Sequence, residues 1–148
     1  MMDADLEIRI LLAERAIEAV MHRYCQALDA ARAADWLDCF TRDALFEVLL
    51  PNGETYVRLE GEADFARFAA ALHDRPGHKH VYASPVFDVD LDAGEARGMS
   101  YFLLFAGDAA RAQVGSFGRV RDRYVRQDGR WRIAERRLQT DGMDPNAP

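Results

Sequence analysis

Cysteine is scarce in this chain of 148 residues, which has only Cys25 and Cys39. Two cysteines without a CxxC spacing make neither a disulfide framework nor a redox motif. We therefore expect two buried, reduced thiols in a cytoplasmic protein. No apolar run approaches the roughly 18 residues that a membrane helix needs, and the N-terminal MMDADLEIR lacks the apolar segment of a signal peptide. The sequence thus predicts no membrane partner.

Patterns for binding metals, phosphate and nucleic acid are also missing. His78 and His80 would share one face of a strand, but two ligands without a third make no metal site. Gly115 and Gly118 fall within a strand pattern, so they form no phosphate loop. The formal net charge is −6, and no aromatic residues alternate with the positive ones as in a nucleic-acid platform. We expect neither a metal nor another cofactor, and no nucleic-acid partner.

The apolar residues, 49% of the chain, are enough for the core of a single domain that spans residues 1–148. Periodicity and turn signals predict helices over 6–31, 36–41 and 62–73, and strands over 44–50, 54–61, 78–91, 95–106, 112–127 and 130–140. The resulting order, α-α-β-β-α-β-β-β-β, is typical of an α+β fold with a mostly antiparallel sheet. Residues 1–5 and 142–148 are expected to be frayed.

Single residues refine this pattern. Asp35 precedes the second helix and is expected to be its N-cap. Trp36 and Phe40 share a face of that helix and are expected to pack inward. Pro85 is expected to mark a bulge or an edge position of its strand, because proline cannot donate to a ladder of hydrogen bonds.

Alternation along strand 112–127 divides its side chains between two faces. Asp122 lies on one face, where it is a candidate second carboxylate for a pocket. Arg119, Arg121 and Arg123 form a row on the other face. We interpret this row as solvated, or as part of a dimer interface in which Glu135 and Asp122 balance the positive charge.

One acidic residue departs from the pattern of the first helix. Met21, Cys25 and Asp29 are spaced i, i+4 and i+8, so a helix aligns them along one side. Two of the three are apolar, and Asp29 lies near the C-terminal end, where the helix dipole disfavours negative charge. Either Asp29 is a solvated residue of the last turn, or its carboxylate points into a pocket and meets a partner there.

Three segments, in their order and spacing, resemble one family of folds. They are YCQALDAARAADWLDCFTRDALFEV (24–48), HVYASPVFDVD (80–90) and YVRQDGRWRIAERRL (124–138). The first is similar to a pattern of Y-x-x-x-x-D, D-W and D-A-x-F, and the last contains D-G-x-W-R-I. Together they resemble the nuclear transport factor 2-like superfamily, and within it the SnoaL-like group. The resemblance implies a cone-shaped, curved sheet wrapped round the long first helix.

The resemblance also implies a catalytic pair. In members related to scytalone dehydratase and dehydrochlorinase, an aspartate at the end of the first helix orients a general-base histidine on the strand after the third helix. By motif, Asp29 and His80 fall on these positions. A neutral imidazole exchanges protons near pH 7, and a carboxylate on its other nitrogen fixes the tautomer and stabilises the imidazolium. The alternative is that His80 makes an ordinary hydrogen bond near the sheet edge.

A second histidine, which the dehydratases carry on the fifth strand, has no counterpart in GSFGRVR (115–121). This argues against a two-histidine dehydration and leaves proton abstraction by one base. The phenols of Tyr24 and Tyr82 are candidates to polarise a substrate oxygen, although a packed aromatic is the better interpretation of Tyr24. The candidate substrate-binding residues are Met21, Trp36, Phe40, Ser84, Phe102 and Asp122, with Ser84 expected to continue the strand face of His80 and Tyr82.

These observations lead to a functional hypothesis. The chain is a cofactor-free lyase or isomerase, cyclases included, in which His80 abstracts a proton from a small, largely apolar molecule and Asp29 orients His80. The alternative is a non-catalytic ligand binder, or a structural subunit resembling the small subunit of ring-hydroxylating oxygenases. The resemblance further implies a homodimer that forms through the sheet.

Overall fold

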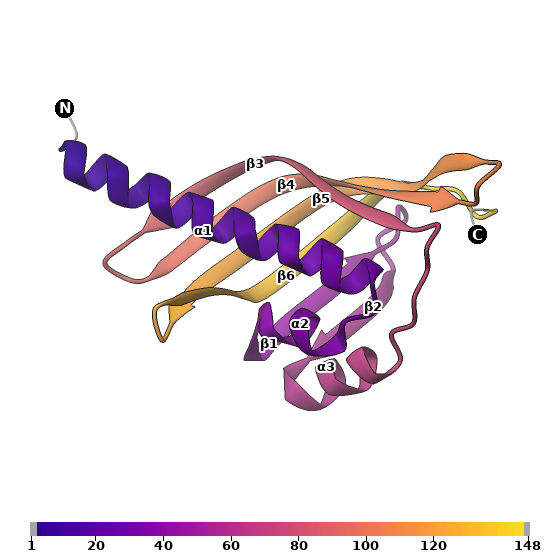
Figure 1. Ribbon diagram of the computed structural model, residues 1–148, viewed down its shortest axis with the longest axis horizontal. Coiled ribbons are helices and arrows are strands. Elements are labelled where there is room, and N and C mark those ends of the chain that lie inside the picture. The colour runs from indigo at the N-terminus through magenta and orange to yellow at the C-terminus, as the bar shows by residue number, and fades with distance from the viewer. Residues whose placement is uncertain (1–2, 147–148) are drawn as a thin grey trace.

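The fold is a curved sheet with one long helix across its inner face, as the computed structural model shows for residues 3–146 (Figure 1). The helices are α1 (Ala4–Asp29), α2 (Ala33–Asp38) and α3 (Gly61–Ala70). The strands are β1 (Phe40–Leu49), β2 (Thr55–Glu60), β3 (Lys79–Asp90), β4 (Glu95–Gly107), β5 (Ala112–Gln127) and β6 (Arg130–Met143). The predicted α+β class and the predicted order of elements are confirmed.

The strands of the described residues form one sheet in the order β2-β1-β6-β5-β4-β3. All neighbours pair antiparallel except β1 and β6, which are parallel. The mostly antiparallel sheet was therefore predicted correctly. Asp128 and Gly129 form the two-residue turn between β5 and β6, and their φ angles of 53° and 75° are the positive values that a type I′ hairpin turn requires.

The core lies between α1 and the inner face of the sheet. Ala13, Ile17, Val20, Met21 and Tyr24 recur along α1 at three- and four-residue steps, and all of them are buried. This is the apolar stripe that the periodicity predicts. The opposite side of α1 faces solvent, so the helix is amphipathic.

Both cysteines lie in this core as free thiols. Burial raises the thiol pKa to about 12 for Cys25 and to about 11 for Cys39. Each thiol therefore stays protonated near neutral pH, and neither is a reactive nucleophile.

The second helix differs from its prediction at both ends. α2 covers Ala33–Asp38 rather than 36–41, and its N-cap is Arg32, so the prediction of Asp35 as N-cap is wrong. Asp35 instead lies in the first turn, where its negative charge suits the helix dipole, and it accepts a hydrogen bond from Arg32 Nε at 2.8 Å. Phe40 pairs with Ile133 of β6, so strand pairing replaces the last predicted helical turn.

Ordered elements extend into both predicted fraying segments, since α1 begins at Ala4 and β6 ends at Met143. Residues 1, 2, 147 and 148 lie outside the described residues. Among residues 3–146, no helix has the length and apolarity needed to cross a membrane.

A bulge interrupts β3, which is an edge strand, as Pro85 predicts. The pairing of β3 with β4 shifts between Ala83 and Val86, and Ser84 has a φ angle of 54°. The shift also overturns one prediction. Ser84 does not continue the face of His80; it is exposed, because a bulge changes which side chains point inward.

The end of α1 is a tight reversal that fixes the position of Asp29. The N–H groups of Arg32 and Ala31 donate to the carbonyls of Ala27 and Leu28 at 2.8 and 3.3 Å, which is the Schellman arrangement. This arrangement needs a left-handed residue, usually glycine. Here Ala31 takes that conformation with a φ angle of 52°, so the chain turns away directly after Asp29.

We predict that Ala31→Gly stabilises the fold. A left-handed conformation costs an L-residue about 1–2 kcal/mol, and the greater flexibility of glycine in the unfolded chain offsets part of the gain. The free energy of unfolding measured in urea should therefore rise by up to about 1 kcal/mol. Ala30→Gly is the matched control, because Ala30 has a φ angle of −97° and gains nothing from glycine. A lower stability for Ala31→Gly than for Ala30→Gly would contradict this prediction.

Candidate active site

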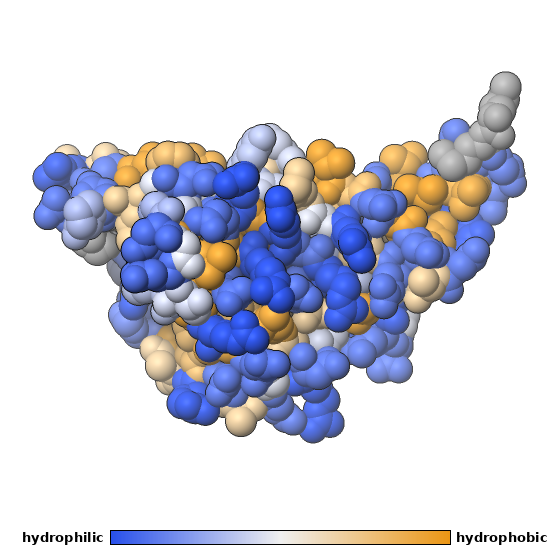
Figure 2. Space-filling view, turned by 180° about the vertical axis from the view of Figure 1, so that it is seen from behind, coloured by the Kyte–Doolittle hydropathy of each residue, from blue (hydrophilic) through white to orange (hydrophobic). Residues whose placement is uncertain are grey.

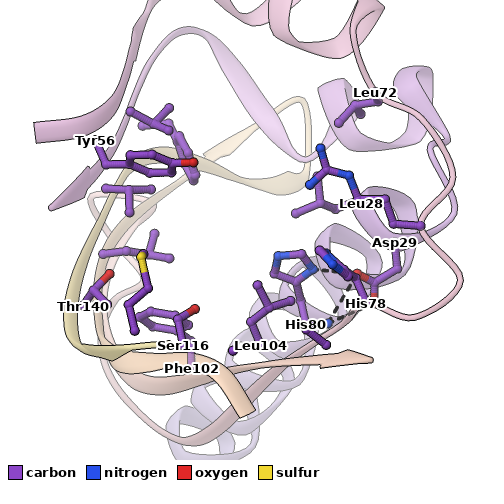
Figure 3. A pocket seen from close by; sticks show the side chains of 18 of the residues that line it. Leu28, Asp29, Tyr56, Leu72, His78, His80, Phe102, Leu104, Ser116 and Thr140 are labelled. Carbon is purple, nitrogen blue, oxygen red and sulfur yellow. Dashed lines mark hydrogen bonds and ion pairs between the residues drawn. The ribbon is translucent and has the colours of Figure 1, made fainter. Parts of the chain in front are cut away.

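A cavity of about 550 Å³ opens between α1, α3 and the inner face of the sheet (Figure 3). Its wall is mostly apolar, with contributions from Leu28, Phe46, Val48, Val57, Phe68, Leu72, Phe102, Leu104 and Leu138. Several polar side chains interrupt this wall. Asp29, His78 and His80 lie on one side of the cavity, and the hydroxyl groups of Tyr56 and Thr140 lie on the other (Figure 3).

Asp29 and His80 are in direct contact at this cavity. Asp29 Oδ1 lies 2.5 Å from His80 Nδ1. The backbone N–H of His80 also donates to Asp29, with a distance of 3.0 Å to Oδ2. The two side chains are only 12% and 24% exposed. A carboxylate at the end of α1 therefore binds both the ring and the main chain of one residue at the start of β3.

This geometry determines which ring nitrogen of His80 carries the proton. An ionised carboxylate only accepts hydrogen bonds, so Nδ1 donates to Asp29. The neutral ring then has an unprotonated Nε2, and no hydrogen bond joins Nε2 to any described residue. Figure 3 shows the ring beside Asp29 and turned toward the cavity. His80 is thus in the form that accepts a proton from a molecule in the cavity.

Behind the cavity lies a buried ion pair that the sequence did not reveal. Arg136 is fully buried, and Asp122 is 7% exposed. Arg136 donates through Nε to Asp122 Oδ1 at 2.9 Å and through Nη2 to Oδ2 at 2.7 Å. Tyr124 donates its hydroxyl proton to the same carboxylate at 2.6 Å. The predicted role of Asp122 in balancing the outer arginine row is wrong, because Asp122 faces inward and pairs with Arg136.

The guanidinium of Arg136 also lies against two tyrosine rings. Its central carbon is 4.3 Å from the ring centroid of Tyr24 and 4.7 Å from that of Tyr82, within the range of cation–π attraction. Tyr24 lines the cavity, whereas Tyr82 does not. Burial raises the pKa of Tyr24 to about 12, with the charge of Arg136 opposing this rise. The Tyr24 phenol therefore stays protonated at neutral pH and is a donor.

The other predicted site residues divide between the cavity and the core. Phe102 lines the cavity. Met21, Trp36 and Phe40 are buried in the core cluster instead, where Trp36 packs against Phe40 with ring centroids 4.8 Å apart. Trp36 and Phe40 thus pack inward as predicted, but neither of them, nor Met21, reaches the cavity wall.

The loop between α3 and β3 brings cavity residues that were not predicted. His73, Arg75 and His78 all line the cavity from this loop. A cluster of polar residues around Pro76 and Gly77 was the available signal, but a loop pattern does not show which cavity it borders. Among the described residues, no group of three His, Cys, Asp or Glu side chains is placed to hold a metal ion.

The fold and this site define a class of proteins. The chain belongs to the SnoaL-like domain family, whose sequence profile matches residues 9–137. This confirms the resemblance to the SnoaL-like group within the nuclear transport factor 2-like fold. No curated protein matches the sequence significantly.

Solved structures show the same fold. A variant of a protein of unknown function from Mycobacterium tuberculosis is 28% identical, covering 99% of this chain and 80% of that chain, with a TM-score of 0.75. A proposed scytalone dehydratase from Novosphingobium aromaticivorans is 23% identical, with 93% and 92% coverage and a TM-score of 0.71. The beta subunit of a proposed aromatic-ring-hydroxylating dioxygenase from the same species is 18% identical, with 91% and 93% coverage and a TM-score of 0.78. The fold thus occurs in proteins of different function.

We predict that the buried pair is essential for stability. Asp122→Ala leaves the Arg136 guanidinium buried without its carboxylate, which typically costs about 3–5 kcal/mol. The free energy of unfolding in urea should fall by that amount. The double variant Asp122→Leu with Arg136→Met removes both charges and should recover most of the loss.

The matched control is Asp141→Ala, which breaks the exposed pair of Asp141 with Arg119 and should change stability little. Equal losses of unfolding free energy for Asp122→Ala and Asp141→Ala would contradict the role of burial.

Proposed function

We propose that this protein is a cofactor-free lyase or isomerase, cyclases included, in which His80 is the general base. The observation that carries the proposal is the hydrogen bond of 2.5 Å between Asp29 Oδ1 and His80 Nδ1. It leaves Nε2 as the acceptor at the wall of an apolar cavity. An oriented imidazole of this kind abstracts a proton from a carbon next to a carbonyl or a leaving group.

The proposed step conserves atoms and electrons. The C–H bond breaks and the proton moves to His80 Nε2. The electron pair of the broken C–H bond forms the new double bond of an enolate or alkene. In a lyase the bond between the neighbouring carbon and the leaving group then breaks, and the electron pair of that bond departs with the leaving group. In an isomerase the proton returns to another carbon. The Asp29 carboxylate stabilises the imidazolium, and the Tyr24 phenol, backed by the charge of Arg136, donates to the oxygen that becomes negative.

The opposite wall of the cavity supplies hydroxyl groups. Tyr56, Ser116 and Thr140 line the cavity there (Figure 3). A hydroxyl group at neutral pH donates a hydrogen bond but does not remove a carbon-bound proton. These side chains fit the binding of a carbonyl or a departing hydroxyl group, while the proton chemistry belongs to His80.

Proton abstraction can be tested without knowing the natural substrate. The enzyme is incubated in D₂O with a panel of small aromatic ketones that carry a hydroxyl or halide on the β-carbon. Deuterium incorporation and elimination are measured by mass spectrometry. We predict that His80→Gln and Asp29→Asn each slow the reaction by about 10²–10⁴-fold, the usual contribution of a general base.

His22→Gln is the control, because His22 is exposed on α1 and does not line the cavity. Exchange that persists at the wild-type rate in His80→Gln would overturn the assignment. Binding of the ketones without any exchange or elimination would favour the alternative of a non-catalytic binder.

The outer face of the sheet supports a proposal about assembly. Met99, Tyr101 and Phe117 are exposed there, Met99 and Tyr101 by 54% and 58%. Figure 2 shows this face with apolar areas among charged ones, and two of its arginines, Arg119 and Arg123, form ion pairs with carboxylates of neighbouring strands. We infer that two copies associate through this face, because a self-complementary interface needs an apolar centre and both signs of charge.

We predict that the wild-type protein sediments as a dimer and that Met99→Asp combined with Tyr101→Asp sediments as a monomer. Buried carboxylates at the centre of an interface oppose association. Leu11→Asp is the control, because Leu11 is 62% exposed on α1, away from the sheet. Analytical ultracentrifugation measures the mass of each form. A monomeric wild type, or a dimer in all variants, would refute this assembly.

A further inference from the structure

The charged groups on the cavity wall differ in whether they already have partners within the protein. Among the described residues, two carboxylates line the cavity, and both already have hydrogen-bond partners. Asp29 binds the ring and backbone of His80, and Asp144 accepts hydrogen bonds from Gln113 at 3.2 Å and from the backbone of Asn146 at 2.8 Å. The permanent positive charge on the wall differs, because it belongs to a residue that has no carboxylate partner within residues 3–146.

That residue is Arg75, which lines the cavity from the loop between α3 and β3. None of the ion pairs among the described residues includes Arg75. Its Nε donates to His73 Nε2 at 3.0 Å, which fixes the plane of the guanidinium. The N–H groups of its two Nη atoms have no hydrogen-bond acceptor among the described residues. Arg75 is exposed, so it lies where the cavity opens to solvent.

The loop that carries Arg75 is held in place at several points. The backbone N–H of His78 donates to the Arg75 carbonyl at 2.8 Å, and Lys79 Nζ donates to the Pro76 carbonyl at 2.9 Å. Gly77 packs so closely on β4 that a Cβ atom there would lie 1.8 Å from the carbonyl oxygen of Gly107. These contacts of the loop hold the backbone of Arg75 in place at the cavity.

We propose that the ligand of this cavity is an amphiphile that places a carboxylate group on Arg75 and its apolar body against the hydrophobic wall. This inference rests on the proposed function, whose substrate class it narrows. A planar guanidinium offers two parallel Nη–H donors that match the two oxygens of a carboxylate. The carboxylate is a handle for orientation, and a separate carbonyl or leaving group activates the proton that His80 removes.

Because Arg75 is a single guanidinium, the cavity fits a ligand with a carboxylate group better than one with a phosphate group. Phosphate sites in proteins usually add backbone N–H groups of a glycine-rich loop or the start of a helix. The loop at Arg75 has neither, and its turn uses the His78 N–H internally. The mostly apolar wall equally disfavours a ligand that is charged along its whole length.

The test compares two probes that differ in charge and share one shape. Binding of 2-naphthoate and of neutral 2-naphthamide is measured by isothermal titration calorimetry at low salt. We expect wild-type protein to prefer the carboxylate roughly tenfold, the scale of a charge-assisted hydrogen bond at a partly exposed site. Arg75→Gln should reduce the ratio of the two affinities to near one, and Arg75→Lys should keep part of the preference for the carboxylate.

Arg126→Gln is the matched control, since Arg126 is an exposed arginine that does not line the cavity. Its preference should equal that of the wild type. Equal affinities for the two probes in wild type, or a preference that survives Arg75→Gln, would overturn the proposal. Failure of both probes to bind would contradict an open apolar cavity and so would also count against it.

The two proposals fail in different ways. If Arg75→Gln abolishes the carboxylate preference but no ketone undergoes exchange, the cavity binds carboxylates and the catalytic proposal is wrong. If exchange depends on His80 while the probes bind equally, catalysis stands and the carboxylate handle is wrong.

Discussion

The Asp29 carboxylate, held between the ring and the backbone N–H of His80, is the interaction on which the rest of the site depends. It joins the end of α1 to the start of the edge strand β3, residues that are far apart in the sequence. A carboxylate so little exposed is costly without partners, and His80 satisfies both of its oxygens. The reversal at Ala31 ends α1 at the point that makes this contact. One interaction therefore anchors the helix to the sheet and selects the tautomer of the base.

A second charged layer supports the first from within the core. Arg136, Asp122 and Tyr124 form a hydrogen-bonded group that is almost wholly buried. The rings of Tyr24 and Tyr82 cover the guanidinium, and Tyr24 alone of these five borders the cavity. The positive charge thus lies close to the cavity without being exposed to it. In a dry environment such a charge acts over a longer distance than it would in water, which suits a reaction in which negative charge develops.

The sequence predicts the elements well and the local irregularities poorly. Alternation and turn chemistry predict β5, β6 and the hairpin at Asp128 and Gly129, because these signals are local. Arg136 was missed because alternation from Trp131 and Ile133 would point Glu135 inward and Arg136 outward. A bulge in the pairing of β6 with β5 shifts this alternation, as the bulge at Ser84 does in β3. Bulges depend on the partner strand, so a single strand's sequence does not reveal them.

The sequence predicted only part of the site, because the contacts that assemble it are also not local in the sequence. The pairing of Asp29 with His80 came from a resemblance, since periodicity shows only that Asp29 is out of place on its helix. Loop residues such as Arg75 carry no periodicity, so their place in the cavity needed the structure. Met21, Trp36 and Phe40 were assigned to the pocket because aromatic and sulfur-containing side chains line pockets and cores alike, and only packing distinguishes the two.

The most direct measurement of the central contact is the ¹⁵N NMR spectrum of the His80 ring at a pH where the ring is neutral. The structure predicts that wild-type His80 carries its proton on Nδ1 and leaves Nε2 unprotonated, because Asp29 accepts only from Nδ1. In Asp29→Asn this preference should be lost, with the ring divided between its two tautomers; His80→Gln identifies the signals. A wild-type ring protonated on Nε2, or identical spectra with and without the Asp29 carboxylate, would contradict the oriented base.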